Sequence, residues 1–249
     1  MEHCFTCGNK GFPDKICPEC GREPTKNSLN LDRHPNVENF IRKTSWSMIP
    51  AKYQGIFWNR EILEREYSAK LSKYNELGYD DKLFIKYLDQ LEKINNIFVE
   101  KLLPQKSAFI IAPAGYSKMT FAYSCMQRAL DAGFSVAPLL DTVELKRVLV
   151  LASENVHYKI DGRISYDDYI MADICFVTVT KLYTRTEAYQ VIQELLDRRS
   201  RRGLCTFVLS RFSLNEIAKE DRRHSFEVVK RISDDSYKYP AIISYAERS

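Results

Sequence analysis

The stretch AFIIAPAGYSKMTFAY, residues 108–123, constrains the fold of this 249-residue chain more than any other. The apolar run Ala108 to Ile111 predicts a buried strand, and the residues from Ala112 to Lys118 predict a tight loop. From Met119 onward, the spacing of apolar residues predicts an amphipathic helix. The stretch therefore predicts a strand, a loop and a helix in the order that a phosphate-binding loop requires.

A working phosphate loop has the pattern G-x-x-x-x-G-K-[ST]. Its glycines let backbone N–H groups surround a triphosphate, its Lys reaches the outer phosphates, and its hydroxyl holds Mg²⁺. Here Ala112 and Ser117 replace the two glycines, and Met119 replaces the hydroxyl residue. By itself this pattern favours an ordinary turn with a surface lysine, but the segments that follow favour a degenerate nucleotide site. Its candidate residues are Gly115, Ser117, Lys118, Met119 and Thr120, the last of which could supply the missing hydroxyl after a small shift.

Two Cys-x-x-Cys pairs near the N-terminus form a metal-binding pattern. Each pair presents two thiolates to one metal ion, and two pairs complete a tetrahedral zinc site. A structural zinc is favoured over a redox pair because a four-thiolate site has no open position for chemistry. So short a segment also has almost no core without the metal. The predicted zinc ligands are Cys4, Cys7, Cys17 and Cys20. The metal would fold this module, which could also serve as a docking surface.

The composition indicates a chain that can bury a sizeable core, since 45% of its residues are hydrophobic. We expect a zinc ribbon over residues 1–25, a linker and helical segment over 26–104, and the main domain over 105–249. No apolar run is long enough to span a bilayer and no signal peptide is visible, so we expect a cytoplasmic protein with no membrane partner. A net charge of +4 is compatible with nucleic acid binding without requiring it.

Apolar periodicity predicts helices that alternate with short buried strands. Helices are expected over residues 60–76, 84–102, 119–132, 143–151, 165–172 and 187–199. Beyond the first strand, further strands are expected over residues 134–139, 174–177 and 205–209. This alternation indicates an α/β fold in which a parallel sheet is covered by helices on both faces.

Several further segments complete a pattern. Ile49-Pro50-x-x-Tyr53 precedes the helices, Leu139-Leu140-Asp141 ends the second strand, and Ala172-Asp173 precedes the third. Ser213-Leu-Asn-Glu216-Ile follows the fourth strand. In this order the pieces resemble the bacterial replicative helicase loaders of the DnaC/DnaI type and the related IstB transposition helpers, which are AAA+ ATPases. The resemblance implies an AAA+-like P-loop domain, a replicative DNA helicase bound through the zinc ribbon, and single-stranded DNA near a basic surface. A homo-oligomer is compatible with the sequence, which does not give the oligomeric state.

The chain departs from that family at its catalytic positions. The family's second acidic motif ends a strand with Asp-Asp or Asp-Glu, which hold Mg²⁺ and orient the attacking water, but Thr178-Val179 stand there. The polar sensor residue after the next strand, usually Asn, is Arg211, whereas Asp221-Arg222 matches the arginine-finger site. Without the carboxylates and the metal-binding hydroxyl, phosphoryl transfer loses its positioning and charge neutralisation. We therefore expect ATP hydrolysis to be absent or very slow, with binding of ATP or ADP left open.

A dense basic run ends the predicted helix over residues 187–199. Such a run is typical of a solvated face that interacts favourably with the C-terminal dipole of the helix. The alternative is contact with the phosphate backbone of DNA. The candidate DNA-binding residues are Arg198, Arg199, Arg201 and Arg202.

The sequence thus favours a DNA-replication protein that resembles a helicase loader, with structural zinc as its cofactor and little or no ATPase activity. One alternative is an active ATP-dependent loader. Another is a zinc-containing interaction scaffold or helicase inhibitor with no nucleic-acid role. A divergent chain of this kind would suit a virus or a mobile element, and would then act in the host cytoplasm.

Overall fold

The computed structural model describes residues 48–76, 81–155, 157–160, 164–179, 185–212, 216 and 242–244. The four predicted zinc ligands and Arg222 lie outside these residues. Among the described helices, none combines the length and the apolar character that crossing a bilayer requires.

The elements follow the order η2 (Ala51–Tyr53), α2 (Arg60–Glu76), α3 (Asp81–Val99), β1 (Ala108–Ile111), α4 (Lys118–Asp131), β2 (Leu140–Asp141), α5 (Thr142–Glu154), α6 (Tyr166–Met171), β3 (Ile174–Val179), α7 (Arg185–Ser200), β4 (Cys205–Ser210) and β5 (Ile242–Ser244).

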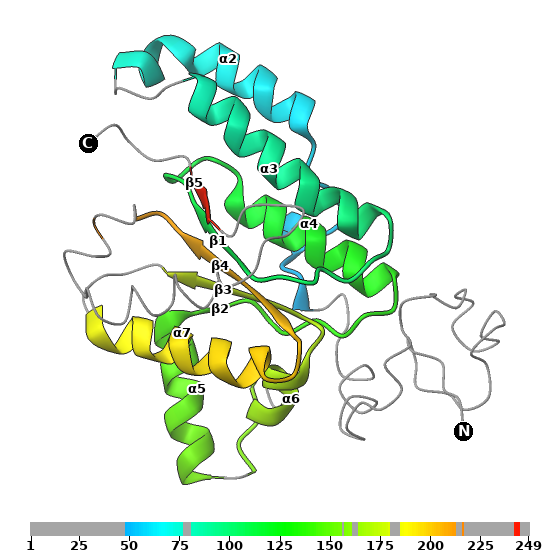
Figure 1. Ribbon diagram of the computed structural model, residues 1–249, viewed down its shortest axis with the longest axis vertical. Helices are drawn as coiled ribbons and strands as arrows, with labels where there is room; N and C mark the ends of the chain where they lie inside the picture. The colour runs from blue at the N-terminus through cyan, green and yellow to red at the C-terminus, as the bar shows by residue number, and fades with distance from the viewer. Residues whose placement is uncertain are drawn as a thin grey trace, which may run out of the picture.

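In the described part of the chain, five parallel strands form one sheet in the order β2-β3-β4-β1-β5 (Figure 1). β1, the strand that precedes the predicted phosphate loop, pairs with β4 on one side and with β5 on the other. The predicted α/β fold with a parallel sheet is therefore confirmed. β5 was not predicted, because three residues are too short for a periodic signal.

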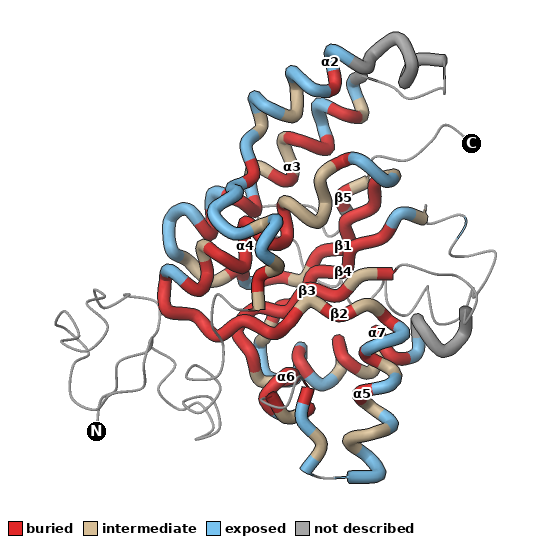
Figure 2. The backbone as a smooth tube through the Cα atoms, turned by 180° about the vertical axis from the view of Figure 1, so that it is seen from behind, coloured by how far each residue is buried: buried red, intermediate tan, exposed pale blue. Residues whose placement is uncertain are grey.

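Helices cover both faces of this sheet (Figures 1 and 2). α3 and α4 lie on one face, where Phe121 and Phe207 belong to one buried cluster. α5, α6 and α7 lie on the other face, where Leu195 and Val208 belong to a second cluster. Neighbouring residues of β4 therefore enter opposite clusters, as the two-residue repeat of a strand requires. Burial on both faces explains why β1, β3 and β4 are apolar over most of their length rather than alternating with polar residues.

The predicted strand over residues 134–139 is wrong in its bounds. Only Leu140–Asp141 forms the regular strand β2, and Val136 makes an isolated parallel bridge to Ile174. Pro138 has no N–H to donate to a ladder. Ser135 donates its backbone N–H, at 2.9 Å, and its hydroxyl, at 2.7 Å, to the carboxylate of Asp173. Residues 134–138 are buried all the same, because they still lie beside β3.

The segment before α2 is held against α4 by a buried glutamine. Gln127 is fully buried and donates from Nε2 to the carbonyls of Tyr53 at 3.0 Å and Ile56 at 3.1 Å. Its Oε1 accepts from the backbone N–H of Gly55 at 2.7 Å. Trp58 is 5% exposed and makes an edge-on contact with a ring of α4. The segment is therefore fixed to the helix that begins at the loop, and Trp58 serves as a core residue.

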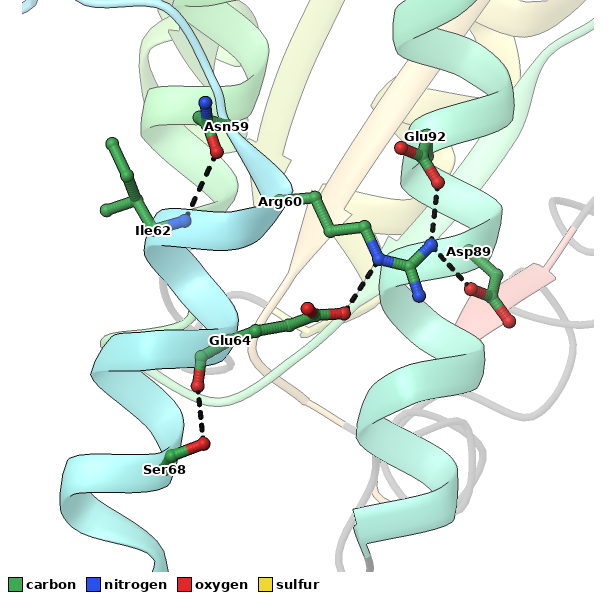
Figure 3. A network of polar contacts seen from close by, with 7 residues as sticks. All are labelled: Asn59, Arg60, Ile62, Glu64, Ser68, Asp89 and Glu92. Atoms are coloured by element: carbon green, nitrogen blue, oxygen red, sulfur yellow. Dashed lines mark hydrogen bonds and ion pairs between the residues drawn. The ribbon is translucent and has the colours of Figure 1, made fainter.

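α2 packs outside α3 and is joined to it by charges (Figure 3). Arg60 contacts Glu64 on its own helix through Nε at 2.7 Å. Its Nη1 contacts Asp89 at 2.7 Å and Glu92 at 2.6 Å, both on α3. Each of these side chains is partly exposed, so the network orients the two helices more than it stabilises them.

Candidate nucleotide-binding edge

The carboxyl ends of β1, β4 and β3 meet at one edge of the sheet, where P-loop domains hold their ligands. In the sheet register, Ile111 of β1 and Val179 of β3 both align with Ser210 of β4. The backbone N–H of Ala112 donates to the carbonyl of Ser210 at 3.1 Å, which extends the ladder into the loop. The loop after β1, the end of β3 and Arg211 after β4 are thus brought to one edge.

The loop over residues 112–117 has the sharp turns of a phosphate loop. Gly115 has a φ of 91° and Ser117 a φ of 54°, both in the left-handed region. Ser117 is the N-cap of α4 but makes no side-chain hydrogen bond to its first turn. A glycine permits such a backbone without strain, whereas a serine there is uncommon. The backbone therefore turns sharply at Gly115 and again at Ser117, where α4 begins.

Lys118 points back across this loop. Its Nζ donates to the carbonyl of Ala112 and, at 2.7 Å, to the carbonyl of Pro113. Burial lowers the pKa of Lys118 to about 8, and the positive charge of Arg211 adds to the lowering. The ammonium is thus bound to neutral carbonyl groups, with a second cation near it.

The hydroxyl position of the motif is not filled by a metal ligand. Met119 is half-buried and packs against the core cluster under α4, where a thioether is an ordinary filler. Thr120 is half-buried on the first turn of α4. Both positions are as the sequence analysis placed them, on the helix that follows the loop.

Carboxylates are missing from the end of β3. Thr178 is half-buried and Val179 is buried there. Asp141, at the end of β2, is aligned with Thr178, but its carboxylate accepts from the N–H groups of Val143 at 2.9 Å and Glu144 at 2.8 Å. β2 is also three strands from β1, roughly 14 Å at the usual spacing of strands. Within the described residues, no group of three His, Cys, Asp or Glu side chains could hold a metal ion.

Arg211 occupies the position of the polar sensor residue. It is exposed, and its guanidinium lies 4.8 Å from the ring centre of Phe212. The hydroxyl of Ser210 accepts from the N–H of Phe212 at 3.0 Å and so fixes the turn that carries Arg211. The sequence alone shows that Arg211 replaces the usual Asn, but it does not show that Arg211 lies near Lys118, because the order of the strands is not visible in the sequence.

Arg199 corrects the prediction of a DNA-binding run. It is fully buried, and all three nitrogens of its guanidinium donate hydrogen bonds. One bond goes to the hydroxyl of Thr206 at 2.9 Å. The others go to backbone carbonyls at 2.5 to 3.4 Å, those of Ile170, Ala172, Asp173 and Cys205. Arg199 therefore joins the start of β3, the start of β4 and α6, and it cannot contact a DNA backbone.

The other three arginines of the run lie on the surface. Arg198 pairs with Glu194 at 2.7 Å and lies over the ring of Tyr166 at 5.5 Å. Arg202 donates to the carbonyl of Arg198 at 2.8 Å, as a cation at a helix C-terminus does. Because β4 begins after this run, these arginines lie at the amino edge of the sheet, opposite the phosphate-type loop. The structure thus separates the two predicted sites.

In sequence, the chain matches no family model and no curated protein. In structure it is similar to a protein described as a primosome component of Streptococcus pyogenes serotype M3, with 15% identity, 65% of this chain and 81% of that chain covered, and a TM-score of 0.44. It is also similar to DnaI, with 16% identity and a TM-score of 0.42. That match covers 66% of this chain and 84% of the DnaI chain. A third similar structure is the ORC1 protein of Aeropyrum pernix in complex with DNA, with 10% identity and a TM-score of 0.40. That match covers 80% of this chain and 48% of the ORC1 chain. At these values the likeness is one of general architecture and assigns no activity.

Proposed function

We propose that this protein acts in DNA replication as a helicase-loader-like adaptor that binds a replicative helicase and hydrolyses little or no ATP. One observation carries the proposal. The edge that holds a loop of phosphate-loop shape, with Lys118 at its end, presents Thr178 and Val179 where catalysis needs carboxylates. The order of segments along the chain, which resembles that of the loaders, supports the choice of partner.

The loss of hydrolysis follows from the chemistry of phosphoryl transfer. That reaction depends on a metal ion that bridges the outer phosphates and on a side chain that orients the attacking water. Neither Val179 nor Met119 can hold a metal ion or orient a water molecule. Arg211 brings a cation to the position that the resemblance assigns to the sensor residue. A protein with this site would bind and hold its partner instead of cycling with the nucleotide.

The proposal assigns the helicase contact to the N-terminal cysteine module. Cys4, Cys7, Cys17 and Cys20 would bind one structural zinc ion, and the folded module would dock on the helicase. Arg198, Arg201 and Arg202 are the arginines of the basic run left for single-stranded DNA once Arg199 is removed from the set.

Copurification with the replicative helicase of the source organism, or of its host, tests the proposal. We expect a complex that survives gel filtration at micromolar concentrations, and loss of the complex when Cys17→Ser and Cys20→Ser remove half of the zinc ligands. Arg202→Gln, a change far from the cysteine module in the chain, is the control and should leave the complex intact. Absence of any complex with the unaltered protein would contradict the proposed function. A DNA-unwinding assay on the complex then separates loading from blocking.

A further inference from the structure

The candidate nucleotide-binding edge holds two cations, Lys118 and Arg211, and its strand β3 ends without the carboxylates that hold a metal ion in a working phosphate-loop enzyme. We propose that this site binds a polyphosphate chain, as in ATP or tripolyphosphate, without a divalent metal, and that Arg211 supplies the positive charge that Mg²⁺ would bring. This inference deepens the proposed function and rests on its loss of hydrolysis, but it does not depend on the helicase partner.

Arg211 and Lys118 are linked through the paired ends of β1 and β4. The carbonyl of Ala112 accepts from Lys118 Nζ, and the N–H of Ala112 donates to the carbonyl of Ser210 at 3.1 Å. Arg211 directly follows Ser210, so the two cations converge on one junction of the backbone. The electrostatic effect of Arg211 on the pKa of Lys118 supports this closeness.

The side chains of this edge do not fit Mg²⁺. That ion requires oxygen ligands in near-octahedral geometry and is usually held by carboxylates together with substrate phosphates. Thr178 offers one neutral hydroxyl, Val179 offers no ligand atom, and the thioether of Met119 is a soft ligand that magnesium does not favour. A divalent cation at this edge would also be repelled by the charges of Lys118 and Arg211.

A phosphate chain fits the same side chains well. Arg211 is exposed and carries N–H donors in a planar fork that matches phosphate oxygens. The N-terminus of α4, a helix of 14 residues, adds backbone N–H groups and a favourable dipole. Lys118 could exchange its contacts with loop carbonyls for phosphate oxygens, which also interact more strongly with an ammonium.

Equilibrium binding of ATP and of tripolyphosphate to the full-length protein tests the inference, measured by calorimetry once in buffer without Mg²⁺ and once with excess Mg²⁺. We expect both probes to bind without Mg²⁺, and ATP to bind at least as tightly as with Mg²⁺, because the free nucleotide carries more negative charge than its magnesium complex. Arg211→Gln should weaken binding about tenfold or more, the effect of losing one charge-assisted hydrogen bond.

Arg65→Gln is the matched control, because Arg65 is also exposed but lies on α2, which packs outside α3. It should leave the affinity unchanged. Binding that requires Mg²⁺, an affinity that Arg211→Gln does not reduce, or no binding of either probe at millimolar concentrations would each overturn the inference. None of these results bears on the helicase complex, so the two proposals fail separately.

Discussion

Arg199→Met is expected to lower the free energy of unfolding by about 3–5 kcal/mol, because several buried acceptors lose their donor at about 1–3 kcal/mol each. The guanidinium is fully buried and donates to one hydroxyl and four carbonyls. Methionine fills much of the space but donates nothing, so these acceptors would be left buried without a donor. Urea denaturation, followed by far-ultraviolet circular dichroism, measures the difference.

Two control variants make this result specific. Arg202→Met removes an exposed arginine from the same run and should change stability by no more than about 0.5 kcal/mol. Arg199→Lys keeps the charge but cannot reproduce the planar fork, so it should lose a large part of the stability as well. If Arg199→Met were as stable as Arg202→Met, the buried network would be wrong and the DNA-contact hypothesis for Arg199 would return.

Gln127→Leu is expected to release the segment before α2 from α4 and to cost about 2–4 kcal/mol. The change removes the acceptor of the Gly55 N–H and the donor to the carbonyls of Tyr53 and Ile56. Each buried group left without a partner costs about 1–3 kcal/mol, and hydrogen bonds to water reduce that cost. Trp58 lies in this segment and is 5% exposed. The emission of Trp58 should therefore shift to longer wavelength, and iodide should quench it. The measurement uses a Trp46→Phe background, in which Trp58 is the one remaining tryptophan of the sequence.

Gln54→Leu is the control for this variant. Gln54 lies in the same segment but is exposed, and it donates to the carbonyl of Ile49 at 2.8 Å. Its loss should cost about 1 kcal/mol and leave the emission of Trp58 unchanged. An unchanged emission in Gln127→Leu as well would show that Gln127 does not hold the segment.

Local signals in the sequence predicted much of the fold. β1 has the predicted bounds, because a polar residue, Ser107, precedes its four apolar residues and Pro113 follows shortly after them. The cap of α5 is equally local, since the carboxylate of Asp141 accepts from two N–H groups of the first turn. Such features depend on neighbours within a few residues along the chain, which a sequence displays directly.

The burial of Arg199 was not predicted, because it lies within a run of arginines that is typical of an exposed surface. Its spacing from Ile192 and Leu195 places it on the apolar face of α7, and that periodicity was a usable signal. The charge pattern favoured a solvated residue instead. The closeness of Lys118 and Arg211 has no such local signal, since it depends on β4 lying between β1 and β3.

We propose that the loop after β1 belongs to a site that cannot hydrolyse ATP. Phosphate release from ATP with excess Mg²⁺, measured on the purified full-length protein beside Lys118→Ala, tests it most directly. We expect the unaltered protein to release phosphate no faster than the variant, because the end of β3 has no carboxylate to hold the metal. Steady turnover that the variant abolishes would contradict the claim and make this protein an ordinary ATP-driven enzyme.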